Sequence, residues 1–148
     1  FSGRLKEENI KKIRDLWKGK LLLKVAESDH YVQKAYQMGL DGVIISNHGG
    51  RQVDVGQATI DSLKDIAPLY KDKLTVMMDS GIRGGADVAR VMATGADFSF
   101  LGRTFMYGVS ALGKKGGHHT VSMLKTQLTQ VMEQLSCAQI DDLQSKLI

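Results

Sequence analysis

The fold of this 148-residue chain is decided by residues 42–52, which read Gly42-Val43-Ile44-Ile45-Ser46-Asn47-His48-Gly49-Gly50-Arg51-Gln52. The first five residues form a short, almost wholly apolar run, as expected of a parallel strand that is buried on both faces. The following residues are polar or glycine and lie just beyond the carboxyl end of that strand. Active sites of β/α folds lie at this end of the sheet.

Three other apolar runs have the same character, and helical patterns alternate with them along the chain. The predicted strands are Leu21–Val25, Gly42–Ser46, Leu74–Asp79 and Phe98–Leu101. The predicted helices are Lys6–Trp17, Asp29–Met38, Ala58–Tyr70, Ala86–Thr94, His118 to about Leu135, and Ile140–Leu147. This alternation predicts a parallel sheet with helical crossovers. A closed eight-stranded barrel needs about 250 residues, so four strands predict half a barrel or a small open sheet.

Two short sequences indicate a repeated unit, namely Met38-Gly39-Leu40-Asp41-Gly42 and Thr94-Gly95-Ala96-Asp97-Phe98. In each, a glycine that can end a helix is followed by an aspartate just before the next strand. A similar regularity is found at the predicted helix starts, where Asp29, Asp61 and Asp87 are placed to interact with free N–H groups.

Composition and charge limit the possible partners. The chain is 43% hydrophobic and 24% charged, which is typical of a globular domain. Its net charge of +4 is spread along the sequence and only 6% of residues are aromatic, so we expect no nucleic-acid binding and favour a small anionic ligand. A single cysteine, Cys137, excludes an internal disulfide and fits a reducing compartment. We therefore expect a cytoplasmic protein, and no bound metal.

His48 and Arg51 form the first candidate site. An imidazole titrates near neutral pH and can take a proton from a substrate. The planar guanidinium of an arginine matches a carboxylate with two hydrogen bonds. Together they indicate a small carboxylic acid that loses a proton near its carboxylate. The alternative is a structural turn whose histidine caps a strand, and the spacing alone leaves both open.

Two glycine–arginine loops, which follow the last two predicted strands, form the second candidate site. They read Asp79-Ser80-Gly81-Ile82-Arg83-Gly84-Gly85 and Gly102-Arg103. The glycine N–H groups at the start of the next helix can face a phosphate, and the arginines supply charge. The alternative is simple turn chemistry with surface arginines, but two such loops on neighbouring strands favour a phosphate site.

Lys24 ends an apolar strand, where an ammonium group is costly unless it faces an anion or an electron-rich ligand. The alternative is that the lysine reaches solvent. A dinucleotide-binding glycine fingerprint is absent after the first predicted strand.

These residues resemble those of a known family, the FMN-dependent 2-hydroxy-acid dehydrogenases and oxidases, which includes lactate and mandelate dehydrogenases, glycolate oxidase and lactate oxidase. The run from Gly42 to Gln52 is similar to the active-site signature of that family almost without change. Residues 79–83 and 102–103 resemble its phosphate loops, and the likeness extends from about Leu16 to about Leu143. It implies an α/β fold in which residues 1–148 are the C-terminal half of a (β/α)8 TIM barrel, with strands five to eight.

The resemblance also implies a role for each candidate residue. His48 would be the catalytic base that takes a proton from the 2-hydroxyl or the 2-carbon of an L-2-hydroxy acid, and Arg51 would bind the substrate carboxylate. Lys24, Ser46 and His48 would lie beside the flavin of the FMN cofactor. Asp79 would meet the ribityl chain or orient an arginine. The residues implied to hold the FMN phosphate are Gly81, Arg83, Gly102 and Arg103.

Some positions depart from the family pattern. Val25-Ala26 follows Lys24 where the family usually has glycine, and Ser80 replaces a common glycine. Gly84 replaces a common second arginine, and Thr104 stands where proline often follows Gly-Arg. None of these changes removes a group with an implied role, so any effect is expected on FMN affinity rather than on the chemistry.

The first four strands of the family barrel have no counterpart in this sequence, which begins at Phe1 rather than at methionine. We therefore expect a fragment that begins near a mobile loop, needs the missing N-terminal half or a second copy, and is inactive alone. The full enzyme is expected to be a homo-oligomer, and attachment to the inner face of the cell membrane is left open. The alternatives are a non-catalytic half-barrel that binds FMN or phosphate, another barrel enzyme that acts on nucleotides, or a fragment that binds no ligand.

Overall fold

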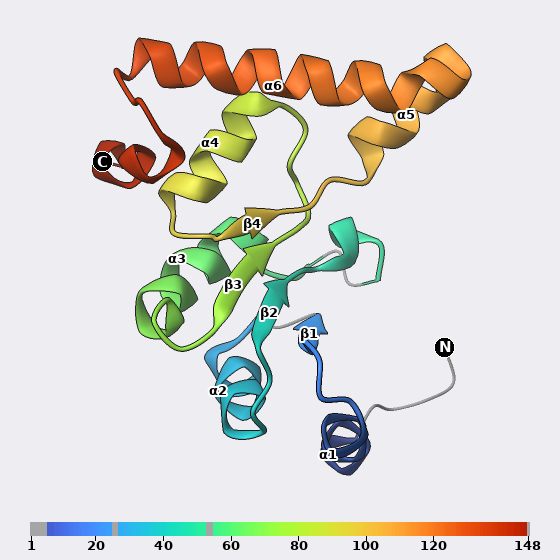
Figure 1. Ribbon diagram of the computed structural model, residues 1–148, viewed down its shortest axis with the longest axis vertical. Helices are drawn as coiled ribbons and strands as arrows, with labels where there is room; N and C mark the ends of the chain where they lie inside the picture. Colours follow the sequence, from blue (N-terminus) through green and yellow to red (C-terminus); the bar gives the residue numbers. More distant parts are fainter. Residues whose placement is uncertain (1–5, 25–26, 53–54, 148) are drawn as a thin grey trace.

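The computed structural model describes residues 6–24, 27–52 and 55–147. A four-stranded parallel sheet lies at its centre, with the strands in the order in which they occur in the sequence (Figure 1). The strands are β1 (Leu22–Lys24), β2 (Gly42–Ile45), β3 (Thr75–Met78) and β4 (Phe98–Ser99). All four strands were predicted, although each is shorter than expected. Val25, at the end of the first predicted strand, lies outside the described residues.

The α-helices agree with the sequence prediction except at one place. The observed elements are α1 (Glu7–Leu16), α2 (Asp29–Gln37), α3 (Thr59–Tyr70), α4 (Gly85–Ala93), α5 (Arg103–Leu112), α6 (Gly116–Gln134) and 3-10 helices at His48–Gly50, Gly113–Lys115 and Ile140–Lys146. Helix α5 was not predicted, because a glycine, two β-branched residues and two aromatic residues lower its helix propensity. A Cβ added to Gly108 of α5 would lie 2.9 Å from the carbonyl oxygen of Gly116 in α6. The glycines therefore allow α5 and α6 to pack closely.

The hydrophobic core lies between one face of the sheet and the helices α2, α3 and α4. Val43, Ile45 and Val76 point from the sheet into this core and are 0% exposed. They pack with side chains from the three helices, including Val32, Ala35, Leu63, Ile66 and Val91. Burial of each large aliphatic side chain contributes about 1.5–3 kcal/mol to stability. This layer of helices fixes the sheet, while the long helix α6 crosses α4 and α5 at one end of the molecule (Figure 1).

The opposite face of the sheet is only partly covered. Side chains alternate along a strand, so this face carries Leu22, Ile44, Met77 and Phe98. Leu22 and Phe98 are 40% and 55% exposed. In the described residues β1 and β4 each pair with one strand only, so both edges of the sheet are open. In a closed barrel this face would be the interior.

Two aspartates fix neighbouring strands at the amino end of the sheet. The Asp41 carboxylate accepts a hydrogen bond of 2.9 Å from the Leu21 N–H, and the Asp97 carboxylate accepts one of 2.7 Å from the Val76 N–H. Each aspartate also donates its own N–H to the carbonyl of the same partner. The repeated glycine–x–aspartate sequence therefore aligns β2 with β1 and β4 with β3.

Asp41 allows a test of this arrangement by pH. Its pKa is lowered from 3.8 to about 2, first by the hydrogen bond from Leu21 and then by the one from Lys20, which with Arg14 outweigh the effect of burial. A lowered pKa in the folded state stabilises the protein above the unfolded pKa, and this contribution is lost as the pH falls through the folded pKa. We expect Asp41→Asn to lower the urea midpoint near neutral pH, and the difference from wild type to shrink as the pH falls from 3.8 towards about 2.

Asp65→Asn, on the exposed side of α3, is the matched control and should change the midpoint little at any pH. If the Asp41→Asn difference were the same at neutral and acid pH, the charge of Asp41 would not be its cause.

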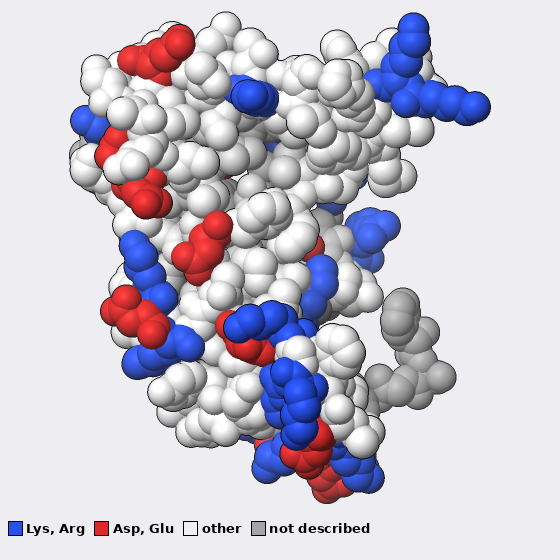
Figure 2. All heavy atoms as spheres, in the orientation of Figure 1, with Lys and Arg blue, Asp and Glu red and all other residues white. Residues whose placement is uncertain are grey.

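No helix in the described part of the chain is long and apolar enough to cross a membrane. On the face shown in Figure 2, the basic side chains near α1 and α2 are interspersed with acidic ones.

Candidate active site

The predicted site residues lie together at the carboxyl ends of the strands. A cavity of about 530 Å³ opens there. Every predicted site residue except Ser46 lines it, namely Lys24, His48, Arg51, Asp79, Gly81, Arg83, Gly102 and Arg103. Ser46 is 0% exposed and hydrogen bonds to Lys24 from below the cavity surface. The structure therefore brings the two candidate sites of the sequence into one cavity.

An ion pair between neighbouring strand ends forms one side of the cavity. The Lys24 Nζ lies 3.0 Å from the Asp79 carboxylate and donates a 2.7 Å hydrogen bond to the Ser46 hydroxyl. The partner of Asp79 is thus a lysine, whereas one alternative from the sequence was that Asp79 orients an arginine. The Lys24 side chain is still 43% exposed, so its charge also faces the cavity.

The charge state of Asp79 follows from these contacts. Burial acts most strongly and raises its pKa, but hydrogen bonds from Ser46, Ser80 and Lys24 and the charge of Lys24 together outweigh burial and lower the pKa below its ordinary value. Asp79 is therefore ionised at neutral pH, where it holds the Lys24 ammonium at the edge of the cavity.

The loop that carries His48 is held in an unusual backbone conformation. His48, Gly49 and Gly50 have φ values of +56°, +69° and +73°. This region is easily adopted by glycine but costs other residues about 1–2 kcal/mol. The Asn47 side chain stabilises the turn by accepting hydrogen bonds from the N–H groups of Gly49 and Gly50, at 3.0 and 3.2 Å. Strain of this kind persists where the surroundings hold it and is found at functional sites.

Arg51 follows on the same loop and is exposed at the edge of the cavity. Its Nε donates a 3.3 Å hydrogen bond to the His48 carbonyl. The candidate base and the candidate carboxylate-binding residue are therefore presented by one short segment.

The phosphate loops differ from the prediction in one respect. The N–H of Gly84 donates to the Asp87 carboxylate at 3.2 Å, and the N–H of Gly85 donates to the Gln127 side chain at 2.8 Å. The prediction that these N–H groups face a phosphate is therefore wrong, because the protein already provides their acceptors. The unpredicted helix α5 offers another N-terminus at the same cavity, with Gly102 and Arg103 as its first residues.

Two hydrogen bonds connect the loops at the cavity. The Arg103 guanidinium donates to the Gly49 carbonyl, and the Thr104 hydroxyl donates to the Arg83 carbonyl at 3.2 Å. A Cβ on Gly49 would displace the end of the Arg103 side chain, and the φ of +69° also favours glycine at this position. The role of Thr104 as a link was not recognised in the sequence, although its departure from the family pattern was the available signal.

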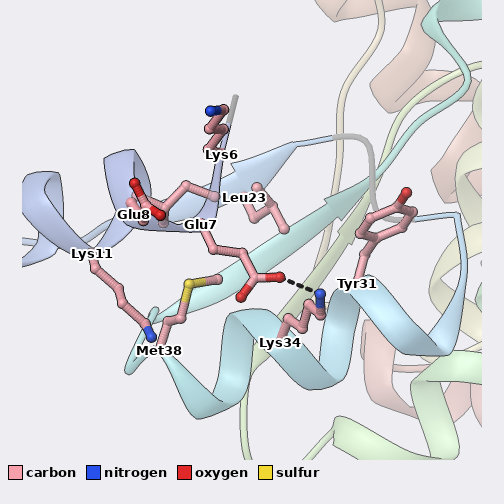
Figure 3. A pocket seen from close by; sticks show the side chains of 9 residues that line it. Lys6, Glu7, Glu8, Lys11, Leu23, Tyr31, Lys34 and Met38 are labelled. Atoms are coloured by element: carbon pink, nitrogen blue, oxygen red, sulfur yellow. Dashed lines mark hydrogen bonds and ion pairs between the residues drawn. The ribbon is translucent and has the colours of Figure 1, made fainter. Parts of the chain in front are cut away.

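A second hollow lies between α1 and α2, with a volume of about 590 Å³ (Figure 3). Its lining includes Tyr31, Met38 and the Glu7–Lys34 ion pair, and none of the predicted site residues. The described residues contain no group of three or more histidine, cysteine or acidic side chains that could hold a metal. The cavity at the strand ends therefore remains the candidate active site.

Known proteins resemble this chain along most or all of its length. A family model described as FMN-dependent dehydrogenase matches residues 1–148. L-lactate dehydrogenase of Bartonella tribocorum is 42% identical over 120 residues, which are 81% of this chain and 31% of the relative. L-lactate dehydrogenase of Alcaligenes faecalis is 34% identical over 148 residues, which are 100% of this chain and 39% of the relative. The chain thus spans about a third of the length of these relatives.

Solved structures also match most of this chain but less than half of their own length. A flavocytochrome b2 variant with sulfite bound superposes with a TM-score of 0.89 at 33% identity, and covers 94% of this chain and 37% of its own. An active mutant of (S)-mandelate dehydrogenase gives a TM-score of 0.86 at 35% identity, and covers 93% of this chain and 38% of its own. The predicted partial TIM barrel is confirmed by these likenesses together with the parallel sheet.

Proposed function

Because the chain belongs to the family of FMN-dependent dehydrogenases, we propose that it is part of a longer enzyme that oxidises an L-2-hydroxy acid, such as lactate, to the 2-oxo acid. The observation that carries this proposal is that His48 and Arg51 line the same cavity as the cationic groups Lys24, Arg83 and Arg103. In this proposal, residues 1–148 are one part of a barrel domain, and the rest of the barrel completes the site.

The residues at the cavity fit FMN. The donor set joins three cations with the N-terminus of α5, and this combination suits a phosphate and an electron-rich ring. A Cβ added to Gly81 or Gly102 would meet nothing within 4 Å, so open space lies beside both glycines. We propose that Gly81, Arg83, Gly102 and Arg103 hold the phosphate.

Lys24 and Ser46 would lie beside the flavin ring, with Asp79 keeping Lys24 in place. FMN, when bound, supplies the two-electron acceptor and ends as FMNH2. The positive charge of Lys24 would favour the added electron density.

His48 and Arg51 would act on the substrate. Arg51 would bind the carboxylate with two hydrogen bonds and so fix the orientation of the substrate. His48 would then take the proton from the 2-hydroxyl or the 2-carbon, since an imidazole nitrogen can act as a general base. The strained turn fixes the backbone positions from which the side chains of His48 and Arg51 extend.

Anaerobic mixing tests this proposal directly. The full polypeptide that carries this chain is loaded with FMN and mixed with a panel of L-2-hydroxy acids while the flavin absorbance is followed. Bleaching by one or more of these acids, and not by their D-enantiomers, is expected. A protein that stays yellow with every acid would favour the non-catalytic flavin-binding alternative.

Residues 1–148 alone are expected to be catalytically inactive. The exposed side chains Leu22 and Phe98 on the uncovered face, and the open edges β1 and β4, would need the rest of the barrel or a second copy to cover them. We expect the isolated chain to associate in sedimentation experiments and to show no flavin bleaching. A compact, stable monomer that oxidises L-lactate would contradict this expectation.

A further inference from the structure

Besides its hydrogen bond to Asp79, Ser80 contacts the loop after β2 and the start of α3. Its hydroxyl donates a 2.7 Å hydrogen bond to the Asp79 carboxylate and accepts a 3.0 Å hydrogen bond from the N–H of Gly49. Its carbonyl accepts a 3.4 Å hydrogen bond from the hydroxyl of Thr59, at the start of α3. One side chain therefore connects the end of β3 with the loop after β2.

The backbone of Ser80 is also strained, with a φ of +77°. Glycine would adopt this conformation freely, whereas serine does so at a cost. His48, on the loop that faces Ser80, has a positive φ as well. The two strained residues belong to segments that the Ser80 hydroxyl joins, and backbone strain persists where surrounding contacts hold it.

The Ser80 hydroxyl completes a continuous series of contacts across the cavity. Lys24 pairs with Asp79, Asp79 accepts from Ser80, and Ser80 accepts from Gly49. The Gly49 carbonyl in turn accepts from Arg103 at the start of α5. The series runs from the lysine proposed to lie beside the flavin ring to an arginine proposed to hold the phosphate.

Asn47 does not replace this connection. It accepts hydrogen bonds from Gly49 and Gly50, but these lie two and three residues away in its own turn. The bond between Ser80 and Gly49 joins residues 31 positions apart. Asn47 therefore shapes the turn, whereas Ser80 determines where the turn lies relative to β3.

We propose that Ser80 is a positioning residue that holds the loop of His48 and Arg51 against the Lys24–Asp79 pair, and thereby sets the place of the base relative to the substrate. This inference rests on the function proposed above. It assigns to a serine, at a position where the family commonly has glycine, a contribution to turnover that does not pass through cofactor binding.

The test compares Ser80→Ala and Ser80→Gly in the full polypeptide that carries this chain. Both variants lose the hydroxyl, but only glycine also removes the backbone strain. Ser136 is the matched control, because it too is a serine with a positive φ, of +54°, and is exposed beyond the end of α6. Ser136→Ala and Ser136→Gly should behave like wild type in every measurement.

In both Ser80 variants we expect kcat for flavin reduction to fall about three- to tenfold, which corresponds to the loss of one ordinary hydrogen bond. The dissociation constant of FMN should stay within about twofold of wild type. Two measurements need no substrate. Hydrogen exchange of the peptide that contains Gly49 should become faster, and the pKa of Asp79 should rise because one hydrogen bond to its charged form is lost.

Two outcomes would overturn the inference. Weaker FMN binding with an unchanged kcat of the loaded enzyme would assign Ser80 to the phosphate loop instead. An impaired Ser80→Ala beside a normal Ser80→Gly would assign the effect to backbone strain. If the wild-type protein failed to oxidise any 2-hydroxy acid, the proposed function would fail, while the exchange at Gly49 and the titration of Asp79 would still decide whether Ser80 holds the loop.

Discussion

Replacing His48 with alanine is expected to slow the reduction of bound FMN by L-2-hydroxy acids about a thousandfold, because general base catalysis typically contributes about 10²–10⁴-fold to a rate. FMN binding should change little. The contacts that hold this loop involve backbone groups of His48 and Gly49 and the side chains of Ser46, Asn47, Ser80 and Arg103, so all of them survive the substitution. Stopped-flow absorbance under anaerobic conditions measures the rate, and flavin fluorescence measures the binding.

His118→Ala is the control for this experiment, since His118 is an exposed histidine in the first turn of α6 and does not line the cavity. It should reduce FMN at the wild-type rate. A His48→Ala variant with a rate within about tenfold of wild type would show that proton transfer to this imidazole is not part of the reaction.

Arg103→Met is expected to weaken FMN binding about a hundredfold. One hydrogen bond to a charged group contributes about 1.5–3 kcal/mol, and a loss of about 2.8 kcal/mol weakens binding about a hundredfold. The same substitution removes the contact between Arg103 and the Gly49 carbonyl, so the loop of His48 should also exchange its amide protons faster. Equilibrium dialysis or fluorescence titration gives the dissociation constant, and mass spectrometry gives the exchange.

Arg90→Met serves as the control, because Arg90 is an exposed arginine on α4 that pairs with Asp87 and lies outside the cavity. It should bind FMN as wild type does. If Arg103→Met bound FMN normally but exchanged faster around Gly49, the guanidinium would act on the loop alone and the proposed phosphate site would be wrong.

The strands could be predicted from the sequence because each is a short apolar run that ends in polar residues or glycine. The strand side chains that face the helices are buried and therefore hydrophobic, so apolar runs in the sequence indicate where the strands lie. Helix α5 could not be predicted in the same way. The reason for Gly108 is the close approach to Gly116 in α6, and that contact exists only in the folded protein.

The sequence indicated which residues would lie near one another at the cavity, but not which contacts they make. Parallel strands bring their carboxyl ends together, so His48, Arg83 and Arg103 could be expected at the same end of the strands. The pairing of Lys24 with Asp79 and the occupied N–H groups of Gly84 and Gly85 depend on distances between side chains far apart in the sequence. No pattern along the chain contains those distances.

Asp41 and Asp97 lie at the amino ends of the strands, whereas the cavity lies at the carboxyl ends. Substitutions around these two aspartates are therefore expected to change the stability of the sheet more than the geometry of the cavity.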